Sequence, residues 1–276
     1  MAAKNVNTNE QVYNAYEHES LETLLASVIC ILMPRGIWVA GFSSTKEVLT
    51  LHHTSYNANK PIWELDFFEH VIVQEPLFTA REKIKGVFIA NDKNIVIPDE
   101  LYSEEHAENW MRHIHFIETK DVITHYPLPV ENAQYLLAVP LGITELIKIN
   151  FKKAEVLPLP VYQFKRANKQ SLYLQCCITN EQVYATLHNY SQLLWHKVFD
   201  YTCAEDIAYA IKLLCVENNI SPSDISMNCD AVSAAEYNVI NELSQYFPGL
   251  KDGNGNTITS RWDPAICLAQ QLIACV

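Results

Sequence analysis

Glycine is scarce in this sequence, at seven of 276 residues, whereas about 7% glycine is typical of proteins. Loops that cradle phosphate groups are usually built from glycine, because the missing Cβ lets backbone amides approach the anion. The scarcity therefore argues against a nucleotide site made of glycine-rich loops.

Runs of basic residues and long apolar runs are also missing. Lys152-Lys153 and Lys165-Arg166 are isolated basic pairs, and the formal net charge is −12, so a nucleic acid or anionic lipid would be repelled. No stretch approaches the ~20 apolar residues that a membrane span needs, and residues 1–20 lack the apolar core of a signal peptide. We predict a cytoplasmic protein with no nucleic-acid partner and no membrane partner.

The eight cysteines contain no C-x-x-C pair. Adjacent Cys176 and Cys177 point to opposite faces of a strand and cannot easily bridge. Cys30, Cys215 and Cys267 stand among apolar residues, where a free thiol acts as a small hydrophobe. Buried reduced thiols are the favoured interpretation, and a structural metal or a disulfide is the alternative.

Two stretches of the chain show the same order of predicted elements. The clearer one runs from Gln170 to Phe247 and reads strand, strand, strand, helix, strand, helix. Its expected elements are Gln170–Ile178, Gln182–His188, Leu193–Phe199, Ala204–Glu217, Asp224–Cys229 and Ala234–Phe247. Ser27 to Met111 has a similar order, so the sequence predicts two copies of one unit.

Capping boxes mark the two helices of the second copy. Thr202-Cys203-Ala204-Glu205 and Ser233-Ala234-Ala235-Glu236 both place a hydroxyl residue three positions before a glutamate, which is the pattern of a helix N-terminus. Apolar residues at helical spacing follow the first box at Ile207, Ala208, Ile211, Leu214 and Cys215.

The predicted domains are an N-terminal arm at 1–20, a first subdomain with a connecting segment at 21–165, and a second subdomain with a terminal helix at 166–276. We expect the arm to be frayed or a lead-in helix. Leu24–Leu32 is a continuous apolar run typical of a central strand, and Ser103 can cap a helix through Met111. The connecting segment, Asp121–Phe164, should hold a strand, a helix and a strand, with the boundary at Lys165–Lys169.

Three hairpin-connected strands, a helix, a strand and a helix, occurring twice, resemble a ribonuclease-H-like βββαβα unit in tandem. That is the α/β architecture of the actin, sugar-kinase and chaperone-ATPase superfamily. The segments Ile95–Tyr102, Tyr126–Pro129 and Ala204–Tyr209 are similar to those of a Bacteroidetes family with an actin-like ATPase fold, and the similarity spans roughly Leu25 to Phe247. That family has no established function, so the resemblance implies a fold and no activity.

Proteins of the actin-like class hold nucleotide with two Asp- and Gly-bearing hairpins and a Gly-Gly turn near the adenosine, where freed amides meet phosphate and Asp holds a metal-bound water. Here the hairpins read Met33–Gly36 and Ile178–Gln182, and the adenosine turn falls at Asn228–Asp230. All three depart from that pattern. The positions that would face a nucleotide in the cleft between the copies are Arg35, Gly36, Asn180 and Asp230, and we predict no cofactor.

Other chemistries lack their residues. Ribonuclease-H nucleases need acidic residues on the first strand, whereas Leu24–Leu32 and Gln170–Ile178 contain none. His113 and His115 with Glu105 and His106 have ligand types for a metal, but a solvated helix end explains them as well.

His52 and His53 point to opposite faces of a strand and cannot share one ion, so no metal site is predicted there. Serine and cysteine nucleophiles have no partner at a recognisable spacing.

One set of aromatic residues has two interpretations. Core packing explains them, but aromatics also anchor interfaces, so a protein partner or a homodimer is the alternative. The set is Trp38, Trp63, Phe67, Phe68 and Trp195.

The sequence thus favours a non-catalytic actin-like protein that acts through protein–protein contact, with the cleft between its copies as the candidate contact site. The alternative is a diverged nucleotide-binding enzyme, an ATPase or phosphotransferase with altered phosphate loops. A nucleic-acid-associated factor would need a basic stripe that only the folded chain could form.

Overall fold

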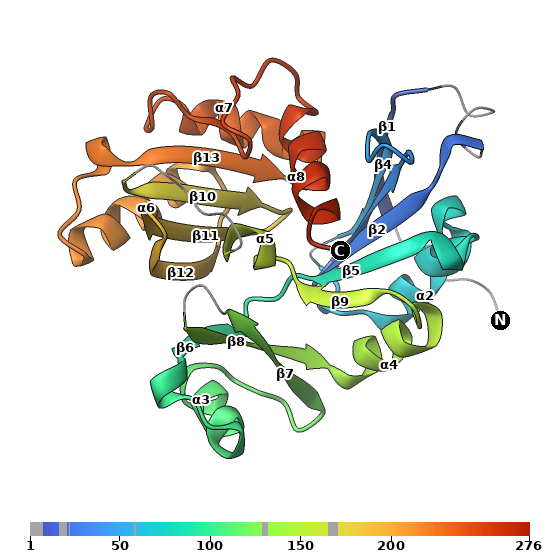
Figure 1. Ribbon diagram of the computed structural model, residues 1–276, viewed down its shortest axis with the longest axis horizontal. Helices are drawn as coiled ribbons and strands as arrows, with labels where there is room; N and C mark the ends of the chain where they lie inside the picture. Colours follow the sequence, from blue (N-terminus) through green and yellow to red (C-terminus); the bar gives the residue numbers. More distant parts are fainter. Residues whose placement is uncertain (1–7, 17–20, 22, 58, 129–131, 165–170) are drawn as a thin grey trace. The chain divides into compact units, whose positions relative to one another are not determined.

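The structure is a computed structural model that describes residues 8–16, 21, 23–57, 59–128, 132–164 and 171–276. The chain divides into two compact units (Figure 1). Unit 1 comprises Met1–Leu159 and Leu272–Val276, and unit 2 comprises Pro160–Gln271. The boundary expected at Lys165–Lys169 lies outside the described residues. Within the described part of the chain, no helix is both long and apolar enough to cross a membrane.

Unit 1 is built on a six-stranded sheet with the order β1-β4-β3-β2-β5-β9. Its strands are β1 Thr8–Asn14, β2 Ser27–Met33, β3 Gly36–Phe42, β4 Val48–Tyr56, β5 Ile84–Ile89 and β9 Glu155–Pro158. The apolar run of β2 is buried throughout, as expected of a central strand. It pairs antiparallel with β3 and parallel with β5, and β5 pairs parallel with β9.

The N-terminal residues that the structure describes do not form the expected frayed arm or helix. Thr8–Asn14 is strand β1, which pairs antiparallel with β4 over its whole length. Backbone hydrogen bonds to a sheet edge need no apolar periodicity, which explains why the pattern of side chains did not predict this strand.

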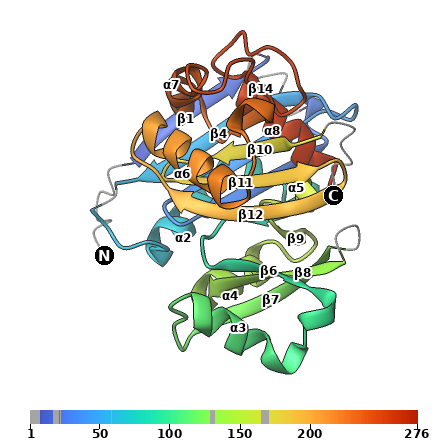
Figure 2. The same cartoon turned by 90° about the vertical axis from the view of Figure 1, so that its left-hand side faces the viewer.

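A three-stranded sheet with the order β6-β8-β7 is inserted in unit 1. Its strands are β6 Asn94–Pro98, β7 Asp121–Leu128 and β8 Ala133–Pro140, and α3 (Ala107–Ile114) lies against it (Figure 2). Its separate small core consists of Ile97, Ala107, Met111, Ile117, Leu136 and Ala138. We call these elements the α3 module.

The α3 module corrects the predicted first copy. The helix expected at Ser103–Met111 belongs to this insertion and not to the repeated unit. The second helix of the unit is instead α4 (Leu141–Asn150), which precedes β9. The expected connecting segment therefore supplies the last helix and strand of the first sheet. The first helix, α2 (Leu65–Gln74), lies between β4 and β5.

Unit 2 is built on a five-stranded sheet with the order β12-β11-β10-β13-β14. Its elements are β10 Tyr173–Ile178, β11 Gln182–Asn189, β12 Gln192–Asp200, α6 Ala204–Glu217, β13 Ser226–Ala231, α7 Tyr237–Leu243 and β14 Lys251–Asp252. This order corresponds strand for strand to β4-β3-β2-β5-β9 of unit 1. The prediction of two tandem βββαβα units is confirmed.

The two faces of the unit 2 sheet differ in polarity. One face packs with α6 and α7 in a core that includes Leu174, Cys176 and Ile178 of β10. The alternate residues of the buried strands carry the polar groups Gln175, Thr186, His188, Asn228 and Asp230, all buried. Two helices contribute partners to this polar face, α5 (Val161–Phe164) and α8 (Asp263–Ile273).

The starts of the unit 2 helices partly match the predicted boxes. Ser233 and Glu236 form the expected pair, since the Ser233 hydroxyl donates to Glu236 at 2.6 Å and accepts from the Ala235 amide at 3.2 Å. The first box is displaced by one residue. Cys203 is the N-cap of α6, and Asp206 rather than Glu205 accepts from Thr202 and Cys203.

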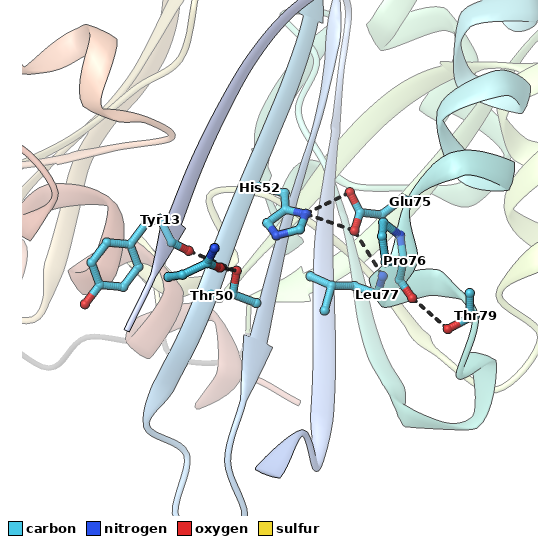
Figure 3. Close-up of polar contacts among 8 residues, drawn as sticks. Tyr13, Thr50, His52, Glu75, Pro76, Leu77 and Thr79 are labelled. Carbon is cyan, nitrogen blue, oxygen red and sulfur yellow. Dashed lines mark hydrogen bonds and ion pairs between the residues drawn. The ribbon is translucent and has the colours of Figure 1, made fainter. Parts of the chain in front are cut away.

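A partly buried hydrogen bond connects β4 to the end of α2 in unit 1 (Figure 3). Nδ1 of His52 lies 3.0 Å from the Glu75 carboxylate, which also accepts from the Leu77 amide at 3.0 Å. Glu75 thus caps the short helix Pro76–Phe78 and binds the sheet with one side chain. On the same strand, the Thr50 hydroxyl donates to the Tyr13 carbonyl at 2.9 Å and so supports β1.

Replacing Glu75 by alanine should lower the free energy of unfolding by about 1–3 kcal/mol, because the Leu77 amide and His52 lose their common acceptor. Urea denaturation followed by circular dichroism measures this change. Glu69→Ala, which removes an exposed acid from the same helix, should change the stability by less than about 0.5 kcal/mol. Equal effects of the two substitutions would argue against a stabilising pair.

Candidate functional site

The first predicted hairpin lies in unit 1, and its backbone is bonded to the protein itself. Arg35 and Pro34 form the tight turn between β2 and β3. The Pro34 carbonyl accepts from the Trp63 amide at 2.7 Å and from the Tyr56 hydroxyl at 2.9 Å. Pro34 has no N–H to offer an anion, and the Arg35 guanidinium donates to the Lys60 carbonyl.

Gly36 is needed for packing in this hairpin. It begins β3, and a Cβ on it would lie 3.0 Å from the Thr54 carbonyl oxygen of the neighbouring strand. The close approach of β4 therefore explains this glycine without a ligand.

The second predicted hairpin, between β10 and β11 in unit 2, is closed by its own hydrogen bonds. The Thr179 amide donates to the Gln182 carbonyl at 2.9 Å, and the Thr179 hydroxyl accepts from the Gln182 amide at 3.1 Å. The Tyr201 hydroxyl donates to the Thr179 carbonyl at 2.7 Å. Asn180 lies at the tip, and its buried Oδ1 has no hydrogen-bond partner among the described residues.

Asp230, the adenosine-turn residue, lies near the end of β13 with its carboxylate fully buried. It is on the polar face of the unit 2 sheet and pairs in register with Cys177 of the parallel strand β10. Four donors surround it. Oδ1 accepts from the Gly253 amide at 3.0 Å, and Oδ2 accepts from Tyr162 at 3.2 Å, Gln175 at 3.1 Å and Gln271 at 3.2 Å.

These donors come from different parts of unit 2, namely α5, β10, the turn after β14 and α8. We call Asp230 and its four partners the Asp230 cluster. A methyl group on Gly253 would overlap the carboxylate and the Gln271 amide, so only glycine allows the backbone to approach this closely. Gln271 also donates to the Cys267 sulfur at 3.0 Å, and burial raises the pKa of that thiol well above its ordinary value.

Glu236 is a second buried acid of unit 2, in the capping box that follows β13. Burial raises its pKa from 4.5 to about 7, although the Ser233 hydroxyl stabilises the charged form. Its electrostatic neighbours are Tyr201 and Cys177. An acid with this pKa is able to exchange a proton near neutral pH.

The four predicted cleft residues are thus distributed over both units. Arg35 and Gly36 lie in unit 1, and Asn180 and Asp230 lie in unit 2 at the carboxyl ends of adjacent parallel strands. Sequence reasoning missed Tyr162, Gln175, Gly253 and Gln271. Only Gln175 could have been found from the sequence, because a polar residue inside an apolar strand indicates a buried polar contact.

The histidines considered as metal ligands have different hydrogen-bond partners in the structure. His113 contacts the Asn109 carbonyl at 2.6 Å, whereas His115 contacts the Asn94 carbonyl at 2.9 Å. His52 bonds Glu75, and burial lowers the pKa of His53 to about 4. Among the described residues, no three His, Cys, Asp or Glu side chains are placed to bind one metal ion.

All eight cysteines are free thiols, and six of them are buried. This agrees with the favoured interpretation of the sequence. Cys176 and Cys229 pair on adjacent strands, and a hydrogen bond between their side chains raises the pKa of Cys229 together with burial.

Comparison with known proteins identifies the fold. Residues 39–250 match the family described as "Protein of unknown function (DUF3822)". No curated protein matches the chain. A Bacteroides thetaiotaomicron structure, described as a protein with actin-like ATPase fold and unknown function, is 14% identical with a TM-score of 0.73, over 93% of this chain and 98% of that chain.

A structure of the PilM-PilN type IV pilus biogenesis complex is 12% identical with a TM-score of 0.57, over 91% of this chain and 98% of that chain. At these identities the likeness concerns the fold alone. The resemblance to an actin-like ATPase architecture is confirmed.

Proposed function

Because the chain belongs to the family described as "Protein of unknown function (DUF3822)" and has an actin-like ATPase fold, we propose that it is a non-catalytic protein that acts through contact with another protein. The family and the fold supply no activity, so the proposal rests on the residues at the predicted nucleotide positions.

One observation carries the non-catalytic part: apart from Oδ1 of Asn180, the polar groups described at these positions bind the protein itself. The Pro34 carbonyl has two donors, the Thr179 carbonyl and hydroxyl are engaged, and the Asp230 carboxylate has four donors. A carboxylate that is buried and surrounded in this way cannot hold a metal-bound water without losing its internal bonds.

The α3 module supports the interaction part. Four large apolar side chains are exposed within one short segment, Leu101, Trp110, Ile114 and Phe116, and Phe116 is 82% exposed. Trp110 and Ile114 are four residues apart on α3 and therefore lie on one face of the helix, and apolar groups that gather on one face are typical of protein contact surfaces. The similar fold in the PilM-PilN complex, whose description names two proteins, is consistent with such a role.

The chemistry of the chain supports a cytoplasmic location. Its eight free thiols are typical of a reducing compartment. Its net charge of −12 disfavours nucleic acid and anionic membranes as partners.

Isothermal titration of the full chain with ATP and magnesium tests the non-catalytic part. We expect no saturable binding up to about millimolar nucleotide, where ΔG is only about −4 kcal/mol, and no phosphate release. A micromolar Kd would contradict the proposal and favour the alternative, a diverged nucleotide-binding enzyme. In that case Arg35→Ala and Asn180→Ala should weaken binding, whereas Arg81→Ala, in a short helix of unit 1, should not.

A further inference from the structure

The outward face of α6 in unit 2 is apolar. The inner face of this helix contributes Ile207, Ile211 and Cys215 to the core. On the outer side, Tyr209 is 70%, Leu213 44% and Val216 69% exposed. A surface helix normally carries polar residues opposite its core, so a helix with two apolar faces indicates a second contact. We call Tyr209, Leu213 and Val216 the outer stripe.

The spacing of the outer stripe specifies the shape of its partner. The intervals of four and three residues place these side chains within about 60° of one another around the helix. The same intervals separate successive d, a and d positions of a coiled coil, where the side chains pack into holes on a facing helix. The stripe therefore fits another α-helix better than a strand or a loop.

The charges beside the outer stripe specify the chemistry of that helix. Glu205, Asp206 and Glu217 of α6 are exposed, and Lys212 is its one basic residue. Lys212 lies with Nζ 5.2 Å from the centre of the Tyr246 ring, and the Tyr246 hydroxyl donates to Glu205 at 3.1 Å. With three exposed acids and one base, the rim carries a net negative charge, and basic side chains of a partner would complement it.

We propose that the outer stripe of α6 binds an amphipathic helix of a second protein, with apolar residues at its a and d positions and Lys or Arg beside them. The inference rests on the proposed function, because it names the class of partner. A second copy of this chain is disfavoured, since it would bring the same acidic rim against itself.

Two synthetic three-heptad peptides test this proposal. Both carry Leu and Ile at a and d, and they differ only in having Lys or Glu at e and g. Fluorescence anisotropy with the full chain should show micromolar binding of the Lys peptide, about ten-fold tighter than the Glu peptide, and weaker binding as salt rises from roughly 50 to 500 mM.

Three substitutions test whether the peptide binds at the outer stripe. Leu213→Asp should weaken binding of the Lys peptide by about ten-fold or more, and Tyr209→Ser should weaken it in the same direction if Leu213→Asp disturbs folding. Ile149→Asp is the matched control, because Ile149 is 62% exposed on α4 of unit 1. It should bind as the wild type does, and circular dichroism checks that each variant is folded.

Equal binding of the two peptides, or no loss in Leu213→Asp, would overturn the proposal. Sedimentation showing wild-type dimers that Leu213→Asp abolishes would assign the stripe to a second copy and also overturn it. These outcomes are distinct from failure of the proposed function, which the nucleotide titration measures separately.

Discussion

Replacing Asp230 by alanine should lower the free energy of unfolding of unit 2 by about 3–5 kcal/mol, because several donors lose their acceptor and each buried group left unsatisfied costs about 1–3 kcal/mol. The substitution leaves the Gly253 amide and the side chains of Gln175, Gln271 and Tyr162 without their common acceptor inside the fold. Gln175 and Gln271 keep their contacts with Gln271 Oε1 and Cys267 Sγ, but the buried Gly253 amide loses its acceptor.

Urea denaturation of the full chain measures the loss, and hydrogen exchange of the β10 and β13 amides assigns it to unit 2. Asp224→Ala removes an exposed aspartate from the same unit and should change stability by less than about 0.5 kcal/mol. If Asp230 were kept for a ligand rather than for the fold, its alanine variant would unfold like the Asp224 variant and would differ only in binding.

The order of elements in unit 2 could be predicted because local signals agree there. The predicted bounds of α6, Ala204–Glu217, are those of the structure, since its apolar spacing and its capping residues mark the same segment. Pairing between strands that are distant in the sequence could not be predicted from local patterns. Strand β7 and the insertion of the α3 module depend on contacts with β6 and β8, which no local period encodes.

The candidate site was predictable only in part. The departures at the two hairpins were visible in the residue types, and the structure adds that the Pro34, Arg35 and Thr179 groups there bind the protein itself. The Asp230 cluster was not foreseeable, because its donors lie at positions as distant as Tyr162 and Gln271. Only a three-dimensional arrangement brings such residues together.

The aromatic residues illustrate the limits of composition. Trp38, Phe67, Phe68 and Trp195 are buried, so core packing is the right interpretation for them and the interface alternative is wrong. Trp63 is half-buried and stacks on Phe68 with ring centres 5.6 Å apart. Exposed aromatic and aliphatic side chains include those of the α3 module and the outer stripe, where helical spacing alone cannot separate a second apolar face from a core.

Raising the pH from about 5 to 8 should lower the free energy of unfolding through Glu236 by about 2–3 kcal/mol. Its pKa is about 7 in the fold and 4.5 without burial, so the folded state binds the proton more tightly than the unfolded chain does. Stability from this group is complete below about pH 4.5 and is lost as the pH rises through 7.

Two histidines act in the opposite direction, which makes a matched variant necessary. Burial lowers the pKa of His53 to about 4 and that of His196 to about 3, so their contribution is present above the unfolded value of 6.5 and is lost on acidification. Glu236→Gln keeps an acceptor for the Ser233 hydroxyl and cannot ionise. The difference between wild type and this variant therefore isolates Glu236.

Urea midpoints are measured at about pH 5, 6, 7 and 8. The stability of the Glu236→Gln variant relative to the wild type should increase with each step in pH, most steeply below pH 7. Glu242→Gln, an exposed acid of α7, should follow the wild type. A constant difference between wild type and Glu236→Gln would mean that Glu236 has an ordinary pKa. The buried acid would then be charged in the fold, and it could not serve as a proton donor near neutral pH.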